Sequence, residues 1–178
     1  MSRAREMATV QPGTWRVAPE LSRIEFRVRK MGLYFVKGRF KRVSGAVEVG
    51  PDGVPAEGVV RIDASSVSTR MPPRDWHLRT RDFLAARQYP EITITVDDVA
   101  AAVSGAIAVS ATVTVRESAA PVQFSAHWHD AGPDGVAMLH VSGVVDRREL
   151  GVRPRRPVDW IVGREVQLEG RLVLQPAW

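Results

Sequence analysis

The chain contains no cysteine, so neither a disulfide framework nor a thiolate metal site is possible. Disulfides form in oxidising compartments, and their absence fits a reducing one. No stretch of the sequence approaches the ~20 consecutive apolar residues that a membrane-spanning helix requires. The first ten residues contain no apolar run of the length found in secretory signal peptides. We therefore expect a protein with no membrane span and a cytoplasmic location.

Lysine is scarce, because 22 of the 25 basic side chains are arginine and 3 are lysine. The formal net charge is +5, and a basic surface attracts the phosphates of nucleic acids or anionic lipids. Acidic residues are interleaved with most of these charges, which is typical of a solvated exterior. The dense basic run Arg153-Pro154-Arg155-Arg156 has no aromatic platform on which bases stack. We expect no nucleic-acid partner, and a partner for this loop stays open.

The sequence also lacks the motifs of common enzyme classes. It has no Gly-x-Ser-x-Gly elbow, phosphate-binding loop, dinucleotide fingerprint or His-Glu-x-x-His. Asp75 and His77 offer an acid and a base, but no nucleophile pairs with them in a recognisable way. His127 and His129 share one strand face, yet two nitrogens alone make a weak metal site. We expect no catalytic residue, no metal and no cofactor.

What the chain does contain is a repeated two-residue alternation of apolar and polar side chains. Ile24, Phe26 and Val28 fall on one face of a segment whose other face is charged, as in a half-buried strand. The pattern recurs between clusters of turn residues, and a chain of 178 residues is most simply one domain. It predicts about eight strands, near residues 22–30, 43–49, 60–64, 92–96, 109–115, 122–128, 139–145 and 166–174.

Regularly spaced strands predict either a β-sandwich or a β-barrel. Nearly every predicted strand has only one apolar face, as expected when the outer face meets water. The inward set includes small residues such as Gly45, Ala111 and Gly170. Small inward residues let a barrel bend and leave room for a ligand, although they also fit close backbone approach. We favour an all-β, antiparallel, eight-stranded barrel.

A short helical insertion is predicted around residues 74–84, where charged and apolar residues recur at helical spacing. Pro72 and Pro73 are expected to end the preceding strand. Asp75 is a candidate for the helix N-cap. We expect this helix to lie across or beside the barrel opening, with Phe83 as its anchor.

The same block closely resembles the signature of the YceI-like family. In that family Arg-Asp-x-His-Leu precedes Asp-Phe and then Tyr-Pro, which here are residues 74–78, 82–83 and 89–90. Further landmarks in the family's order are Val36–Phe40, Ile62–Thr69 and Gly143–Gly151, with leucine at position 150 where phenylalanine is usual. The similarity covers roughly residues 13 to 175. One departure is the segment 113–122, which lacks the family's glycine and second threonine and so is expected to turn differently.

The resemblance implies a lipocalin-like barrel in a single YceI-like domain, residues 13–178, after a flexible segment, residues 1–12. It also implies non-catalytic binding or carriage of a polyisoprenoid, a prenyl quinone or a fatty amide or acid in a tunnel, and it suggests a homodimer. The alternative is a structural or stress-associated interaction module with a filled barrel and no stable lipid. The residues expected to contact the ligand are Phe26, Val28, Val47, Val60, Ile62, Arg74, His77, Leu78, Phe83, Ile94, Val113, Phe124, Leu139, Val141, Leu168 and Leu172.

The polar cluster in this block has two interpretations. Arg74 and His77 are suited to a polar head group at the mouth, arginine for a phosphate and histidine for a hydroxyl. Alternatively, the cluster is a structural latch in which Asp75 caps the helix and binds Arg79 or Arg147 across the end of the barrel.

Overall fold

The computed structural model describes residues 10–101, 105–131 and 135–178. Eleven strands form one antiparallel sheet, and the helices among these residues are short. Neither α-helix of the described part has the length and apolarity to cross a membrane. The strands are β1 (Gly13–Val17), β2 (Arg23–Lys30), β3 (Tyr34–Phe40), β4 (Val43–Val49), β5 (Pro55–Asp63), β6 (Val67–Ser68), β7 (Glu91–Ala101), β8 (Ile107–Val115), β9 (Ser118–Ala131), β10 (Ala137–Asp146) and β11 (Val162–Pro176). The helices are η1 (Ala64–Ser66), α1 (Pro72–Leu78) and α2 (Val158–Ile161).

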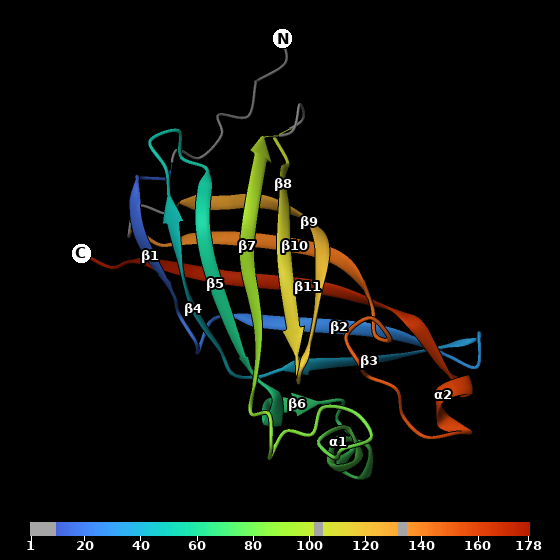
Figure 1. The fold of residues 1–178 in the computed structure, drawn as a ribbon. Coiled ribbons are helices and arrows are strands. Elements are labelled where there is room, and N and C mark those ends of the chain that lie inside the picture. Colours follow the sequence, from blue (N-terminus) through green and yellow to red (C-terminus); the bar gives the residue numbers. More distant parts are fainter. Residues whose placement is uncertain (1–9, 102–104, 132–134) are drawn as a thin grey trace.

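Eight of the strands form a closed ring in the order β1-β4-β5-β7-β8-β9-β10-β11, which returns to β1 (Figure 1). The ring closes where Trp15 to Val17 of β1 pair with Leu174 to Pro176 of β11. Alternate residues of a strand point to opposite faces, and β8 alternates between buried and more exposed positions along its whole length. The predicted antiparallel, eight-stranded barrel is confirmed.

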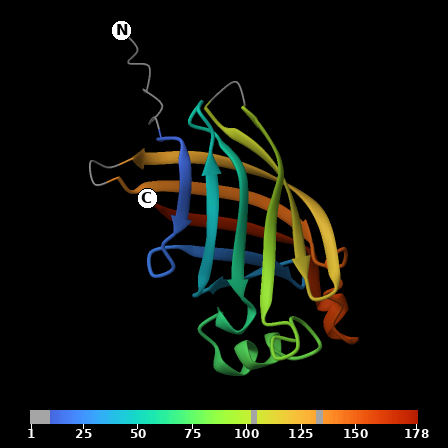
Figure 2. The same cartoon turned by 60° about the vertical axis from the view of Figure 1, so that its left-hand side comes forward.

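The remaining strands β2, β3 and β6 extend the sheet beyond the ring. Strand β11 is long enough to pair with β1 near its end and with β2 from Val162 to Arg171. Strand β3 pairs fully with β2, but on its other edge only Arg39 and Phe40 pair with β6. Among the described residues, most of this edge of β3 therefore has no strand partner (Figures 1 and 2).

The helical insertion differs from the prediction in its bounds and in its start. α1 ends at Leu78, and the rest of the predicted 74–84 helix consists of turns. Pro72 and Pro73 begin the helix, because a proline fits the first helical turn, where its missing N–H group has no partner to lose. The N-cap is Met71 and not Asp75. α1 lies at one end of the barrel, as expected from the sequence (Figure 1).

Two further details concern the chain start and the unusual hairpin. Of the segment predicted to be flexible, residues 1–9 lie outside the described residues, but Val10 is buried and the carbonyl of Gln11 accepts a hydrogen bond from the Trp15 indole. The packed part therefore begins before Gly13.

The β8–β9 hairpin turns on Arg116, whose φ of 56° places a non-glycine residue in the left-handed region. The Arg116 guanidinium donates to the carbonyls of Arg81 and Phe83.

Candidate functional site

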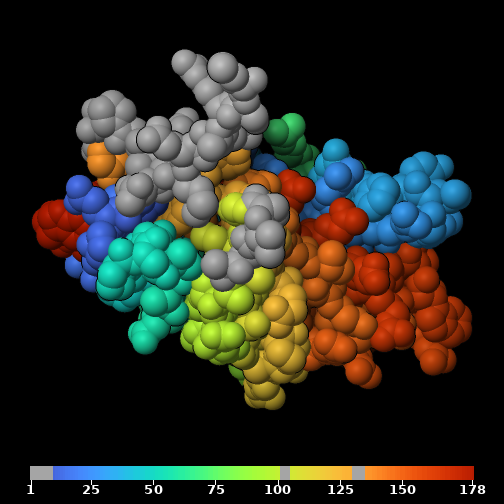
Figure 3. Space-filling model, turned by 90° about the horizontal axis from the view of Figure 1, so that it is seen from above, coloured from blue at the N-terminus to red at the C-terminus, as the bar shows by residue number. Residues whose placement is uncertain are grey.

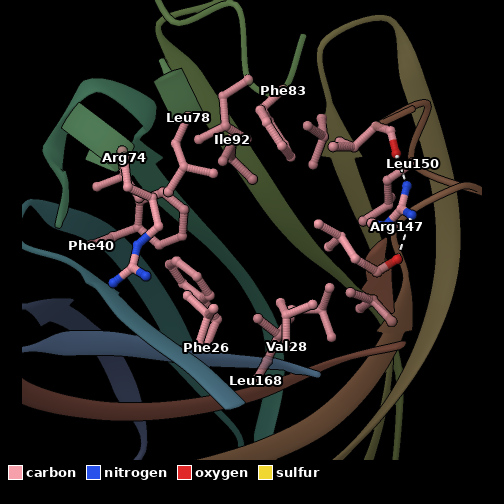
Figure 4. Close-up of a pocket in the computed structure, with 18 of the residues that line it drawn as sticks. Phe26, Val28, Phe40, Arg74, Leu78, Phe83, Ile92, Arg147, Leu150 and Leu168 are labelled. Atoms are coloured by element: carbon pink, nitrogen blue, oxygen red, sulfur yellow. Dashed lines mark hydrogen bonds between the residues drawn. The ribbon is translucent and has the colours of Figure 1, made fainter. Parts of the chain in front are cut away.

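A cavity of about 620 Å³ occupies the half of the barrel next to α1. Its wall is formed by apolar side chains of β2, β3, β5, β6, β7, β8, β10 and β11, with α1, the turn after it and the segment 147–161 around its end (Figure 4). Figure 4 shows Phe26, Val28 and Leu168 on one side and Leu78, Ile92 and Phe83 on the other. A second, smaller cavity of about 80 Å³ lies above it, and the two share Ile24, Ile94 and Leu168 as lining residues. The barrel interior is therefore not filled.

All sixteen residues predicted to contact a ligand line one of these two cavities. Both cavities are bordered by Ile94 and Leu168. The larger cavity is also lined by Phe26, Val28, Ile62, Arg74, His77, Leu78, Phe83 and Val113. The smaller cavity is also lined by Val47, Val60, Phe124, Leu139, Val141 and Leu172.

Other lining residues were missed by sequence reasoning. One group comes from segments without strand periodicity, namely the turn that follows β10, the segment that precedes α2, and α2 itself. A second group comes from β3 and β6, whose alternation is short or interrupted by Gly38. The family signature Gly143–Gly151 was a signal for one member of the first group, because it marks the turn that contains Leu150. The main missed residues are Val36, Phe40, Val67, Leu150, Val152, Val158 and Ile161.

The charged residues that line the larger cavity are all basic or histidine: Arg29, Lys30, Arg74, His77 and Arg147. Lys30 is exposed, whereas Arg147 is 4% exposed. Exposed lining residues, including Met71, show where the cavity meets solvent, between the β2–β3 hairpin and α1. We call this opening the mouth. A ligand with an anionic or strongly polar end would find its best partners at the mouth.

Arg74 and Asp75 are joined through Thr69. The buried Asp75 carboxylate accepts hydrogen bonds from the Thr69 backbone N–H, at 2.7 Å, and from the Thr69 hydroxyl. The Arg74 Nε donates to the same hydroxyl at 2.7 Å. Asp75 thus holds the start of α1 to the end of β6, which is a latch, but its partner is neither Arg79 nor Arg147. Arg79 instead donates to the backbone carbonyls of Ser65 and Val67.

His77 is paired with Asp82, its Nε2 lying 3.2 Å from the carboxylate, and not with Asp75. Its ring also packs edge-on against Phe83, with 5.1 Å between the ring centroids. Asp82 has a second basic neighbour, because the Arg155 Nε lies 3.8 Å from its other oxygen. These contacts connect α1 and the turn after it to the loop that precedes α2.

Arg147 fastens α2 to the barrel and is the most fully bonded side chain of the site. Its Nε donates to the carbonyl of Gly163, and its two terminal nitrogens donate to the carbonyls of Val152, Asp159 and Val162 and to the Asp159 carboxylate, at 2.8–3.0 Å. A guanidinium has five N–H donors, and these five bonds use all of them. Arg147 is therefore a structural residue and has no donor left for a ligand.

Asp159 is the acidic partner of Arg147. The hydrogen bond from Arg147 holds the pKa of the Asp159 carboxyl below its ordinary value, and the positive charges of Arg147 and Arg148 act in the same direction. Arg148 also binds this carboxylate directly, at 3.0 Å. The end of the barrel next to α2 is thus tied down by a carboxylate that stays ionised at neutral pH.

Comparison with known proteins places this geometry in a family. Residues 15–174 match the YceI-like domain. The chain belongs to the YceI-like family. A UPF0312 protein of Vibrio cholerae is 30% identical over 112 residues, which are 62% of this chain and 59% of that protein. The aligned part therefore spans less than two thirds of that relative.

Solved structures of the YceI-like fold match nearly the whole barrel. BcnA of Burkholderia cenocepacia is similar over 88% of this chain and 98% of its own, with a TM-score of 0.78 and 21% identity. A polyisoprenoid-binding domain from Saccharophagus degradans, implicated in plant cell wall breakdown, is similar over 91% of this chain and 98% of its own, with a TM-score of 0.69 and 17% identity. At these identities the similarity establishes the fold alone.

Proposed function

We propose that this protein binds a long apolar ligand inside its barrel and carries it without converting it chemically. The ligand classes are those that the family resemblance suggests: polyisoprenoids, prenyl quinones and fatty amides or acids. The polyisoprenoid-binding domain with the same fold supports this proposal. The observation that carries it is the apolar cavity of about 620 Å³, because an unfilled interior is unusual in a well-packed protein.

The size of the cavity sets the scale of the ligand. At about 30 Å³ for each group the size of a water molecule or a methylene, 620 Å³ holds on the order of twenty such groups, or about four isoprene units. Burying about twenty of them contributes ~16 kcal/mol. After an association cost of about 8 kcal/mol, roughly 8 kcal/mol remains, which corresponds to micromolar binding. A longer chain would extend toward the second cavity or out of the mouth.

The ligand's polar end, in this proposal, lies at the mouth. The second cavity has only apolar side chains, alanine, proline and glycine around it, so burying a polar group there would leave that group without a partner. At the mouth, Arg74 uses its Nε and one terminal nitrogen to bind Thr69, which leaves further guanidinium N–H groups for a head group.

Filling the cavity tests the proposal. In Leu168→Trp a larger ring would occupy the junction of the two cavities, and we expect it to weaken the binding of a prenol of about twenty carbons by roughly tenfold or more. Gln167→Trp is the matched control, because Gln167 is the exposed neighbour of Leu168 on the opposite face of β11. Displacement of an environment-sensitive dye measures the affinity, and mass spectrometry of the gently extracted protein identifies any lipid that co-purifies.

Two results would refute the proposal. One is the absence of both a co-purifying lipid and measurable binding of prenols, prenyl quinones or fatty acids. The other is equal binding by Leu168→Trp and Gln167→Trp, which would place the apolar ligand outside the barrel. Conversion of a bound prenol or quinone to a product would retain the cavity as the site but contradict the non-catalytic role.

A further inference from the structure

Three segments surround the mouth of the larger cavity: residues 29–35, 70–76 and 153–160. We call them together the mouth rim. Lys30, Met71 and Arg74 line the cavity directly, as does Val158 of the third segment. The backbone N–H of Met31 donates to the carbonyl of Ile161, which joins the β2–β3 hairpin to the end of α2. Figure 3 shows the hairpin, in light blue, beside the orange-red region of α2, and Figure 1 places α1 at the same end of the molecule.

Most of the large hydrophobic side chains that are exposed among the described residues belong to the mouth rim. Ten large hydrophobic side chains are exposed in the described part of the chain, and seven of them belong to these 22 residues. Leu33, at the tip of the hairpin, is 77% exposed, and Trp76 and Trp160 are each 68% exposed. Such a concentration in three segments around one cavity mouth marks an interaction site, whereas scattered exposed residues need no explanation. The remaining four are Met31, Tyr34, Phe35 and Met71.

The mouth rim also carries the protein's positive charge. Its three segments hold seven basic and two acidic residues, a formal net charge of +5, which equals that of the whole chain. The other 18 basic and 18 acidic residues of the chain therefore cancel. The two acidic residues of the rim are already bound, Asp75 to Thr69 and Asp159 to Arg147 and Arg148.

Charged and apolar groups of the rim are packed together. The guanidinium of Arg156 lies over the Trp160 ring at 4.7 Å, and that of Arg29 lies over the Phe35 ring at 5.3 Å. An anionic bilayer complements this combination. Its phosphates attract arginine and lysine, its interfacial layer accommodates tryptophan and tyrosine, and its acyl region accepts aliphatic tips. A second copy of the rim would instead oppose like charges, which disfavours self-association.

We propose that the mouth rim docks the protein on an anionic phospholipid bilayer, with the cavity mouth facing the membrane. The inference rests on the proposed function, because it supplies the route by which an apolar ligand passes between bilayer and cavity. Docked in this way, the ligand would leave the acyl layer and enter the barrel beside Lys30 and Arg74 without crossing bulk water.

Vesicle flotation tests the docking. We expect the protein to float with phosphatidylcholine vesicles that contain about one third phosphatidylglycerol, and to bind them at least roughly tenfold more tightly than pure phosphatidylcholine. Raising the salt from about 0.1 M to about 1 M shortens the screening length from ~10 to ~3 Å and should release most of the protein. Leu33→Ser and Trp160→Ser should each weaken binding roughly tenfold.

Leu21→Ser is the matched control, because Leu21 is 58% exposed but precedes β2 at its other end, away from the hairpin tip. It should bind vesicles within about twofold of the unmodified chain. All variants should keep their melting temperature and their affinity for a prenol dissolved without vesicles, since none of the three side chains lines a cavity.

The possible failures are distinguishable. Prenol binding in solution without any flotation at low salt overturns the docking surface and leaves the proposed function standing. An equal loss of vesicle binding in Leu21→Ser and Leu33→Ser overturns the location of the docking surface. Self-association in place of flotation, seen in sedimentation and abolished by Leu33→Ser, also overturns the proposal. Flotation that depends on Leu33 in a protein that binds no prenol, quinone or fatty acid sustains the docking surface and refutes the carrier role.

Discussion

Replacing Gly38 with alanine is expected to push the Phe26 ring into the cavity and weaken ligand binding with little loss of stability. Gly38 of β3 pairs directly with Phe26 of β2. A Cβ atom at position 38 would lie 2.2 Å from Cζ of Phe26, so the ring must move. Cζ is the far end of a side chain that already lines the cavity of about 620 Å³, and empty space is available to receive it.

Gly143 provides a matched comparison on the other side of the barrel. It pairs directly with Phe124, and a Cβ atom there would lie 2.5 Å from that ring and 3.1 Å from the carbonyl oxygen of Gln123. Phe124 is buried and borders only the cavity of about 80 Å³, so its ring has little room to move. Overpacking costs about 1–3 kcal/mol, whereas replacing a strand glycine with alanine returns about 0.5–1 kcal/mol.

We therefore expect Gly38→Ala to change the free energy of unfolding by less than about 1 kcal/mol and Gly143→Ala to lower it by about 1–2 kcal/mol. A displaced Phe26 ring that excludes about two methylene-sized groups of ligand removes ~1.6 kcal/mol of binding, roughly tenfold in affinity. Urea unfolding followed by tryptophan fluorescence gives the stabilities, and dye displacement by a prenol gives the affinities. The reasoning fails if Gly38→Ala is the more destabilising variant, or if it leaves prenol affinity unchanged.

Two further predictions concern the bonds between Arg147 and Asp159 that hold α2 to the barrel. Arg147→Leu removes the side-chain donor to four backbone carbonyls and one of the two arginine partners of the Asp159 carboxylate. It should lower the free energy of unfolding by about 3 kcal/mol or more in urea titrations. A loss under about 1 kcal/mol would show that the guanidinium is dispensable. Because the pKa of Asp159 is lowered on folding by the Arg147 hydrogen bond, its stabilising effect is complete above the ordinary aspartate pKa of about 3.9 and is lost as the pH falls through the lower folded value. Melting temperatures measured from pH 7 to about pH 2 should therefore fall less in Asp159→Asn than in the unmodified chain, and parallel curves would contradict this assignment.

The two-residue alternation was sufficient to predict most strands and the inner wall, because it assigns each side chain to a face. The choice of a lipocalin-like barrel over a sandwich rested mainly on the family resemblance. Val113 and Phe124, for example, could be placed on the inner face without knowledge of which strands pair. β1 and β3 were not counted among the predicted strands, since β1 is short and Gly38 interrupts the apolar face of β3. Alternation says nothing about irregular segments, so the part of the wall between Leu150 and Ile161 could not be assigned from periodicity.

The role of Asp75 was mistaken for a related reason. An acidic residue near the start of a predicted helix favours an N-cap, and sequence spacing alone does not show how far the helix extends toward its N-terminus. Here the prolines at positions 72 and 73 extend the helix by a turn, which carries Asp75 inside it and turns its carboxylate to Thr69. The sequence therefore predicted that Asp75 has a structural hydrogen-bonding role. It did not identify Thr69 as the partner, because that contact depends on the path of the chain after β6.

The position of the mouth follows from strand pairing. The chain bends between β1 and β2 and again between β3 and β4, so each pair of short strands replaces one long strand of a regular barrel. β4 pairs with β5 over most of its length, but β3 meets β6 at only two residues. The unpaired stretch of β3 is an edge of the sheet, and Val36 and Phe40 of this strand line the larger cavity. In the proposed function the ligand enters beside β3, so substitutions that narrow the barrel on this side should weaken ligand binding most strongly.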